Sequence, residues 1–113
     1  MKRSLNKETI NLCGKTTILE SSYILKNAVC YIGNDTGTAH LAGISGTKVF
    51  IVSSARDNIN RWYPYGKNNI VFRNRVECEG CWLHTDTCKY DIKCLKEINK
   101  DDVLIKLKEF LND

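Results

Sequence analysis

Four residue types that can bind an anion or a sugar occur together in the stretch YIGNDTGTAH, residues 31–40. Asp35 supplies a carboxylate, Thr36 a hydroxyl, Gly37 an open backbone and His40 an imidazole. Backbone N–H groups at a helix start attract phosphate oxygens, and a glycine there lets a bulky anion approach closely. A histidine can donate a further hydrogen bond to that anion, whereas a carboxylate accepts hydrogen bonds from sugar hydroxyls. The stretch therefore predicts a site for a sugar linked to phosphate.

The same residues also allow a purely structural interpretation. Asp35 and Thr36 could cap the following helix, and His40 could fill a polar gap in a wall of the fold. Because ligands of open parallel sheets sit where a strand turns into a helix, four suitable residue types at one such turn favour binding.

The strands that must position this turn are predicted from apolar runs. Three runs lie at residues 28–33, 48–54 and 69–74, and a further short run at 9–14 is closed by a glycine. The run at 28–33 is continuously apolar and stops at glycine, which predicts a strand buried on both faces.

Helices are expected between and after these strands. Spacing of apolar residues predicts helices over 17–28, over 38–45 and over about 100–111. The first should have Thr16 or Thr17 as its N-cap, with Glu20 in the first turn. Helices that alternate with strands predict an α/β fold with a parallel, Rossmann-like sheet and right-handed crossovers.

Bulk composition limits the function classes. A chain of 113 residues with 42% hydrophobic residues has room for one domain. Its net charge of +4 comes from scattered lysines and arginines, which permits an anionic ligand but predicts no nucleic-acid partner. Because no stretch approaches the roughly 18–20 apolar residues of a membrane span, and the start lacks a signal-peptide core, we expect a cytoplasmic location. Peripheral contact with the inner membrane stays open.

Six cysteines suggest thiol or metal chemistry. Four lie in the segment 76–95: Cys78, Cys81, Cys88 and Cys94. They could hold zinc, with His84 as an alternative ligand, form disulfides or remain free. Free thiols are the leading expectation, so neither a metal nor another cofactor is predicted. Cys13 and Cys30 lie in apolar runs and are expected in the core.

Three segments together resemble a known family. Residues 32–52, IGNDTGTAHLAGISGTKVFIV, resemble the signature of the glycosyltransferase family 9 heptosyltransferases. Residues 11–28 are similar to that family's Asn-Leu-x-Gly-Lys-Thr segment, and RWYPYG at 61–66 is similar to its Trp-x-Pro-Tyr-Gly loop. The cysteine segment also resembles members with a Cys-x-x-Cys insert, so the similarity spans about residues 9–111. Aromatic residues of the 61–66 loop could stack on a base or sugar, or cover the sheet end.

The resemblance implies a metal-independent, inverting GT-B transferase that moves a heptose from an ADP-sugar to a lipopolysaccharide core acceptor. By it, Asp35 would bind donor-sugar hydroxyls. Thr36 and Gly37 would bind the diphosphate through backbone amides, and His40 through its ring. Thr16 would lie near the adenine. No catalytic residue is assigned.

Family members have two Rossmann-like domains, and the amino-terminal one holds the catalytic carboxylate. Residues 1–113 are accordingly expected to form a single partial carboxy-terminal domain, with a Cys-rich insert at about 76–95 and a terminal helix at about 100–111. Such a portion should bind the donor but be inactive alone. It would need an amino-terminal half or an oligomeric partner, through which the acceptor would be reached. A non-catalytic nucleotide- or partner-binding module and a zinc-knuckle interaction module remain the alternatives.

Overall fold

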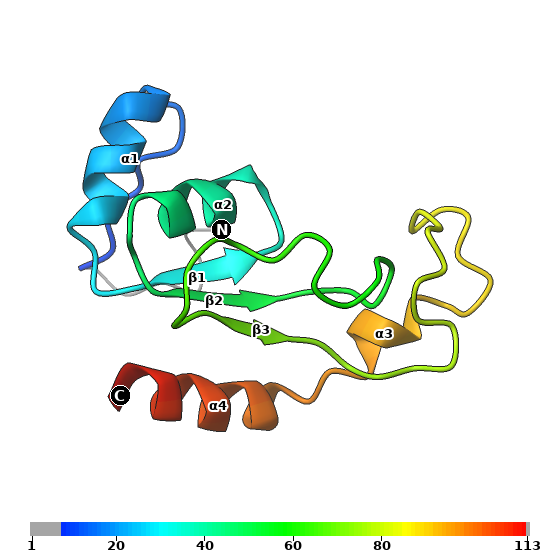
Figure 1. The fold of residues 1–113 in the computed structure, drawn as a ribbon. Helices are drawn as coiled ribbons and strands as arrows, with labels where there is room; N and C mark the ends of the chain where they lie inside the picture. The colour runs from blue at the N-terminus through cyan, green and yellow to red at the C-terminus, as the bar shows by residue number, and fades with distance from the viewer. Residues whose placement is uncertain (1–7, 113) are drawn as a thin grey trace.

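A three-stranded parallel sheet forms the centre of the computed structural model, which describes residues 8–112 (Figure 1). The strands have the order β1-β2-β3 and parallel register, with Asn34 opposite Val52 and Val52 opposite Phe72. In chain order the elements are α1 (Ile18–Lys26), β1 (Tyr31–Asn34), α2 (Gly37–Ile44), β2 (Val49–Val52), β3 (Ile70–Phe72), α3 (Lys93–Lys96) and α4 (Lys100–Asn112). The α/β class and the parallel sheet predicted from the sequence are confirmed.

The core lies on both faces of β2, the central strand. On one face, Val49 and Ile51 pack against the fully buried Ala39 and Ala42 of α2. On the other face lies α4 (Figure 1), whose Phe110 ring is 5.6 Å from the fully buried Phe50 ring. Side chains alternate between the two faces of a strand, so β2 is covered on both sides. None of the helices in residues 8–112 is long and apolar enough to cross a membrane.

The strand β1 is not buried on both faces, which corrects the expectation from its apolar run. It lies at the edge of the sheet, and its residues are alternately half-buried and exposed. Ile32 pairs with Phe50 and so faces the α4 side, yet it remains 53% exposed. In the described part of the chain, α4 covers β2 on this face but not Ile32. An apolar run shows which side chains of a strand can be buried, but the position of the strand in the sheet decides whether other elements cover them.

The expected strand at 9–14 is also wrong. The segment is exposed and ends in a turn at Gly14, whose φ is +72°. The Asn11 side chain accepts a hydrogen bond from the Cys13 amide at 3.0 Å, which is local turn chemistry that competes with strand formation. Cys13 is exposed rather than in the core, and Cys30 is half-buried, where burial raises the pKa of its thiol.

Helix α1 begins where the capping pattern predicted. The hydroxyl of Thr17 accepts a hydrogen bond from the Glu20 amide at 3.2 Å. One side of the helix packs on α2, where the hydroxyls of Ser22 and Ser45 are 3.1 Å apart. The helix also exposes large apolar residues, among them Leu19 at 83%. An apolar helix face of this kind is typical of a surface that another element covers.

The loop that contains RWYPYG packs on the carboxyl half of α2. A Cβ atom at Gly43 would lie 2.5 Å from the Tyr65 carbonyl oxygen, so this close approach requires a glycine. Asn69 donates to the Tyr65 carbonyl at 2.8 Å and accepts from the Val49 amide at 2.9 Å, which ties the loop to the start of β2. Tyr65 therefore lies at the amino ends of the strands, opposite the end where Asp35 follows β1.

Candidate functional site

The amino terminus of α2 is an open cluster of hydrogen-bond donors. Thr36 is its N-cap in extended conformation, but the Thr36 side chain makes no capping hydrogen bond. Its hydroxyl lies instead 3.4 Å from the Tyr31 hydroxyl. Among residues 8–112, no acceptor is bonded to the amides of Gly37 and Thr38, and the first turn carries no acidic side chain. Such a helix start keeps its partial positive charge available to an anion.

The space beside Gly37 is open. A Cβ atom added at Gly37 would meet nothing within 4 Å. Glycine is thus not needed for packing within the described protein at this position. Its effect is to leave room beside the helix terminus for a group that comes from outside the chain.

A cavity of about 540 Å³ lies between α1 and α2 next to this terminus. It is lined by Thr16, Ile18, Ser21, Gly37, Thr38, His40, Leu41 and Ile44. The structure thus brings Thr16 together with Gly37 and His40, whereas Asp35 and Thr36 lie outside the lining. The cavity has the size of a small-molecule pocket and mixes apolar walls with a few polar groups.

Asp35 lies beside His40, with 3.8 Å between the carboxylate Oδ1 and the ring Nε2. The two side chains are 29% and 36% exposed. Burial raises the pKa of Asp35 above its ordinary value; the His40 ring opposes this, and the nearby Asp57 carboxylate adds to it. Asp57 was not predicted as a site residue. Its signal in the sequence is its place after β2, at the same end of the sheet as Asp35.

A family model for glycosyltransferase family 9 (heptosyltransferase) matches residues 1–91. The chain belongs to glycosyltransferase family 9. All of the residues placed above around the amino terminus of α2 lie inside the matched part, whereas α3 and α4 lie beyond it. No curated protein and no solved structure matches the chain at a significant level.

The four cysteines of the segment 76–95 in this family 9 chain do not come together as the zinc site considered from the sequence. All six are free thiols. Cys81, Cys88 and Cys94 line a cavity of about 200 Å³ together with His84, but Cys78 is not part of it. Within residues 8–112, no group of three or more His, Cys, Asp or Glu side chains is arranged to hold a metal ion.

The raised pKa of Asp35 predicts a pH-dependent gain in stability for Asp35→Asn. Above its folded-state pKa, Asp35 is charged and its burial disfavours the folded state; below the ordinary value of 3.8, both states are protonated and this cost is absent. The variant should therefore melt at a higher temperature than the unmodified chain at pH 7, and the gain should shrink as the pH falls towards 3.8.

Thermal melts at a series of pH values measure this difference. The exposed Asp86→Asn is the matched control and should show no such gain. A lower melting temperature for Asp35→Asn at pH 7 would show that the contact with His40 outweighs burial.

Proposed function

We propose that this chain binds a nucleotide-sugar donor of the ADP-heptose type at the amino terminus of α2. The observation that carries the proposal is the pair of amides at Gly37 and Thr38, which have no acceptor among residues 8–112 and begin a helix beside the open space at Gly37 in a chain of family 9. The diphosphate would accept hydrogen bonds from these amides and from the His40 ring, since helix starts and imidazoles both suit phosphate oxygens. Asp35 would accept hydrogen bonds from hydroxyls of the attached sugar.

The cavity between α1 and α2 suits the nucleoside part of such a donor. Its apolar walls include Ile18, Leu41 and Ile44, which offer a surface to a flat base. At its edge the hydroxyls of Thr16 and Ser21 lie 2.8 Å apart and can bond to polar atoms of the base or ribose. We therefore propose that Thr16 lies near the adenine of the bound donor.

The exposed edge of the sheet supports a proposal about architecture. We infer that the described sheet is part of the carboxy-terminal, Rossmann-like domain of a GT-B transferase, and that a further protein body covers β1 and α1. Leu19 on α1 and Ile32 on β1 are large, apolar and exposed, and the outer edge of β1 pairs with no other described strand. That body, an amino-terminal half or a partner chain, would bring a lipopolysaccharide core acceptor to the donor.

Isothermal titration calorimetry of the folded chain tests the donor proposal. ADP and ADP-heptose should bind with measurable heat and raise the melting temperature, because a ligand of the folded state stabilises it by mass action. Inorganic sulfate at equal ionic strength is the control for a non-specific salt effect. Absence of heat at millimolar ADP would overturn the proposal.

Mass spectrometry after incubation with ADP-heptose and a core acceptor tests the second half of the proposal. We expect binding of the donor without product from these residues alone. A transferred sugar would show that the catalytic base lies within this chain.

A further inference from the structure

The loop that follows β2 is held rigidly by the segment that follows β3. Three consecutive carbonyls of the loop each accept a hydrogen bond from that segment. Gly80 N donates to Ala55 O at 2.8 Å, Trp82 N to Arg56 O at 3.1 Å, and Arg73 Nη2 to Asp57 O at 3.0 Å. The backbone of the loop is therefore positioned by contacts far apart in sequence.

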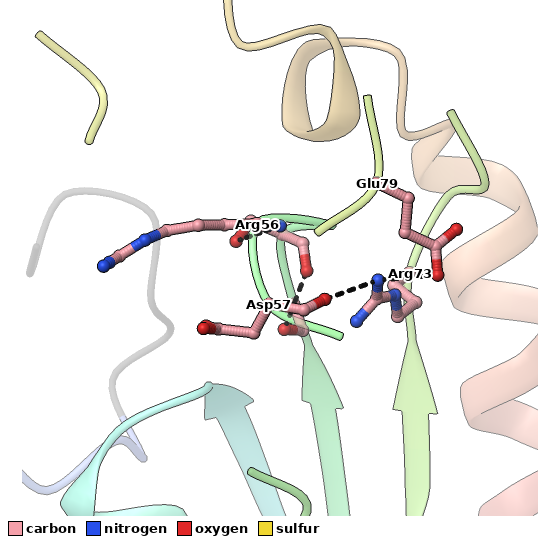
Figure 2. A network of polar contacts seen from close by, with 6 residues as sticks. Arg56, Asp57, Arg73 and Glu79 are labelled. Atoms are coloured by element: carbon pink, nitrogen blue, oxygen red, sulfur yellow. Dashed lines mark hydrogen bonds and ion pairs between the residues drawn. The ribbon is translucent and has the colours of Figure 1, made fainter. Parts of the chain in front are cut away.

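The strongest of these contacts is centred on Arg73. Its side chain is only 8% exposed, and Nη2 also forms an ion pair with Glu79 at 2.9 Å (Figure 2). Charge-assisted bonds in a buried place hold their geometry better than exposed ones. Arg73 and Glu79 thus join the end of β3, the loop after β2 and the Cys-rich segment.

The side chain of Arg56, in the same loop, takes no part in this network, to which the residue contributes only its carbonyl. Figure 2 shows its side chain extending away from Arg73 and Glu79, on the side of β1. Within residues 8–112, the buried Arg56 Nε has no hydrogen-bond partner and Arg56 forms no ion pair. A buried donor without an acceptor is costly, and the Arg73 Nε is in the same state. Unlike Arg73, however, the Arg56 guanidinium has no acidic partner among the described residues, so it is available to an anion.

Arg56 belongs to the same end of the sheet as the donor site. Asn34 of β1 pairs with Val52 of β2, so the segments that follow the two strands start side by side. The residue after Arg56 is Asp57, whose carboxylate is close enough to Asp35 to influence its titration. The loop therefore lies against the turn that leads from β1 into α2.

We propose that Arg56 is a further donor-binding residue, whose guanidinium binds the phosphates of a nucleoside diphosphate from the side opposite α2. The inference rests on the proposed function, and it adds a cation that the α2 turn does not contain. A guanidinium can bond two phosphate oxygens at once, which would orient the diphosphate between the loop and the helix terminus. The network around Arg73 would then serve to position Arg56.

This inference is tested by measuring how tightly ADP and adenosine bind to three proteins. These are the unmodified chain, Arg56→Ala and Arg56→Lys. Hydrogen bonds to charged groups contribute about 1.5–3 kcal/mol, so Arg56→Ala should weaken ADP binding roughly tenfold or more. Adenosine has no phosphate, so its affinity should stay the same. Arg56→Lys keeps the positive charge but lacks the planar guanidinium that can bond two phosphate oxygens, so its ADP affinity should lie between those of Arg56→Ala and the unmodified chain.

Arg61→Ala is the matched control, because it removes an arginine of the same loop whose guanidinium stacks on the Trp82 ring at 4.3 Å. It should leave ADP affinity within about twofold of the unmodified chain, because Arg61 is already engaged. Should Arg56→Ala melt early, the Arg56→Gln variant takes its place.

The outcomes separate the two proposals. Binding of ADP by the unmodified chain, with equal affinity in Arg56→Ala, would overturn the assignment of Arg56 alone. An equal loss for ADP and adenosine would assign Arg56 to the nucleoside or to structure and would also overturn it. Failure of the unmodified chain to bind ADP would overturn the donor site itself, and Arg56 with it.

Discussion

Gly37→Val should weaken ADP binding by about a hundredfold while the chain keeps its fold. The loss corresponds to two charge-assisted hydrogen bonds at the start of α2, which together contribute roughly 3 kcal/mol. Apart from its chain neighbours and the backbone of its own helix, no atom lies within 4 Å of a Cβ at this position, so we expect the valine side chain to be accommodated and to obstruct an anion at the amides. Because valine is a better helix former than glycine, the melting temperature should not fall.

Calorimetry with ADP and a thermal melt of the same sample measure both parts of this result. Gly37→Ala serves as the graded variant, since its single methyl group should reduce the affinity less than valine does. Equal ADP affinity in the valine variant would mean that the phosphates bind elsewhere.

Phe50→Ala should lower the free energy of unfolding by about 3–5 kcal/mol, the range typical of a phenylalanine removed from a packed core. Phe50 is fully buried in the central strand and its ring packs on Phe110 of α4. Removing it would leave a cavity between the sheet and α4. In a chain of this size, that is a large part of the total stability.

Urea denaturation followed by circular dichroism measures this change. Leu19→Ala is the matched control, because Leu19 is an exposed residue of α1 and its loss should change the stability by about 0.5 kcal/mol or less. If the two variants lost similar stability, α4 would not be packed on the sheet as described.

Local sequence signals predicted the elements well where capping and spacing agreed. The Thr17 cap, the helix expected over 38–45 and the apolar run of β2 all correspond to observed elements. The same signals failed at residues 9–14, where an asparagine side chain and a glycine turn compete with strand pairing. They also wrongly predicted that β1 is buried on both faces, because the residues of a strand do not specify which elements lie beside it.

The turn from β1 into α2 could be read from the sequence because its residues are neighbours in the chain. Asp35, Gly37 and His40 lie within six positions, so a strand end and one helical turn are enough to bring them together. Backbone geometry over such a short distance leaves few alternatives, and the type of each residue then indicates its chemistry.

Only the tertiary structure decided which distant residues join that turn. Thr16 reaches the cavity of Gly37 because α1 packs on α2, and Arg56 reaches this end of the sheet because β2 pairs with β1. Its loop is held by Arg73, seventeen positions along the chain, through a contact that no local pattern specifies. Contacts between distant residues depend on strand order and helix packing, which arise from the burial of the whole core rather than from the spacing of any one segment.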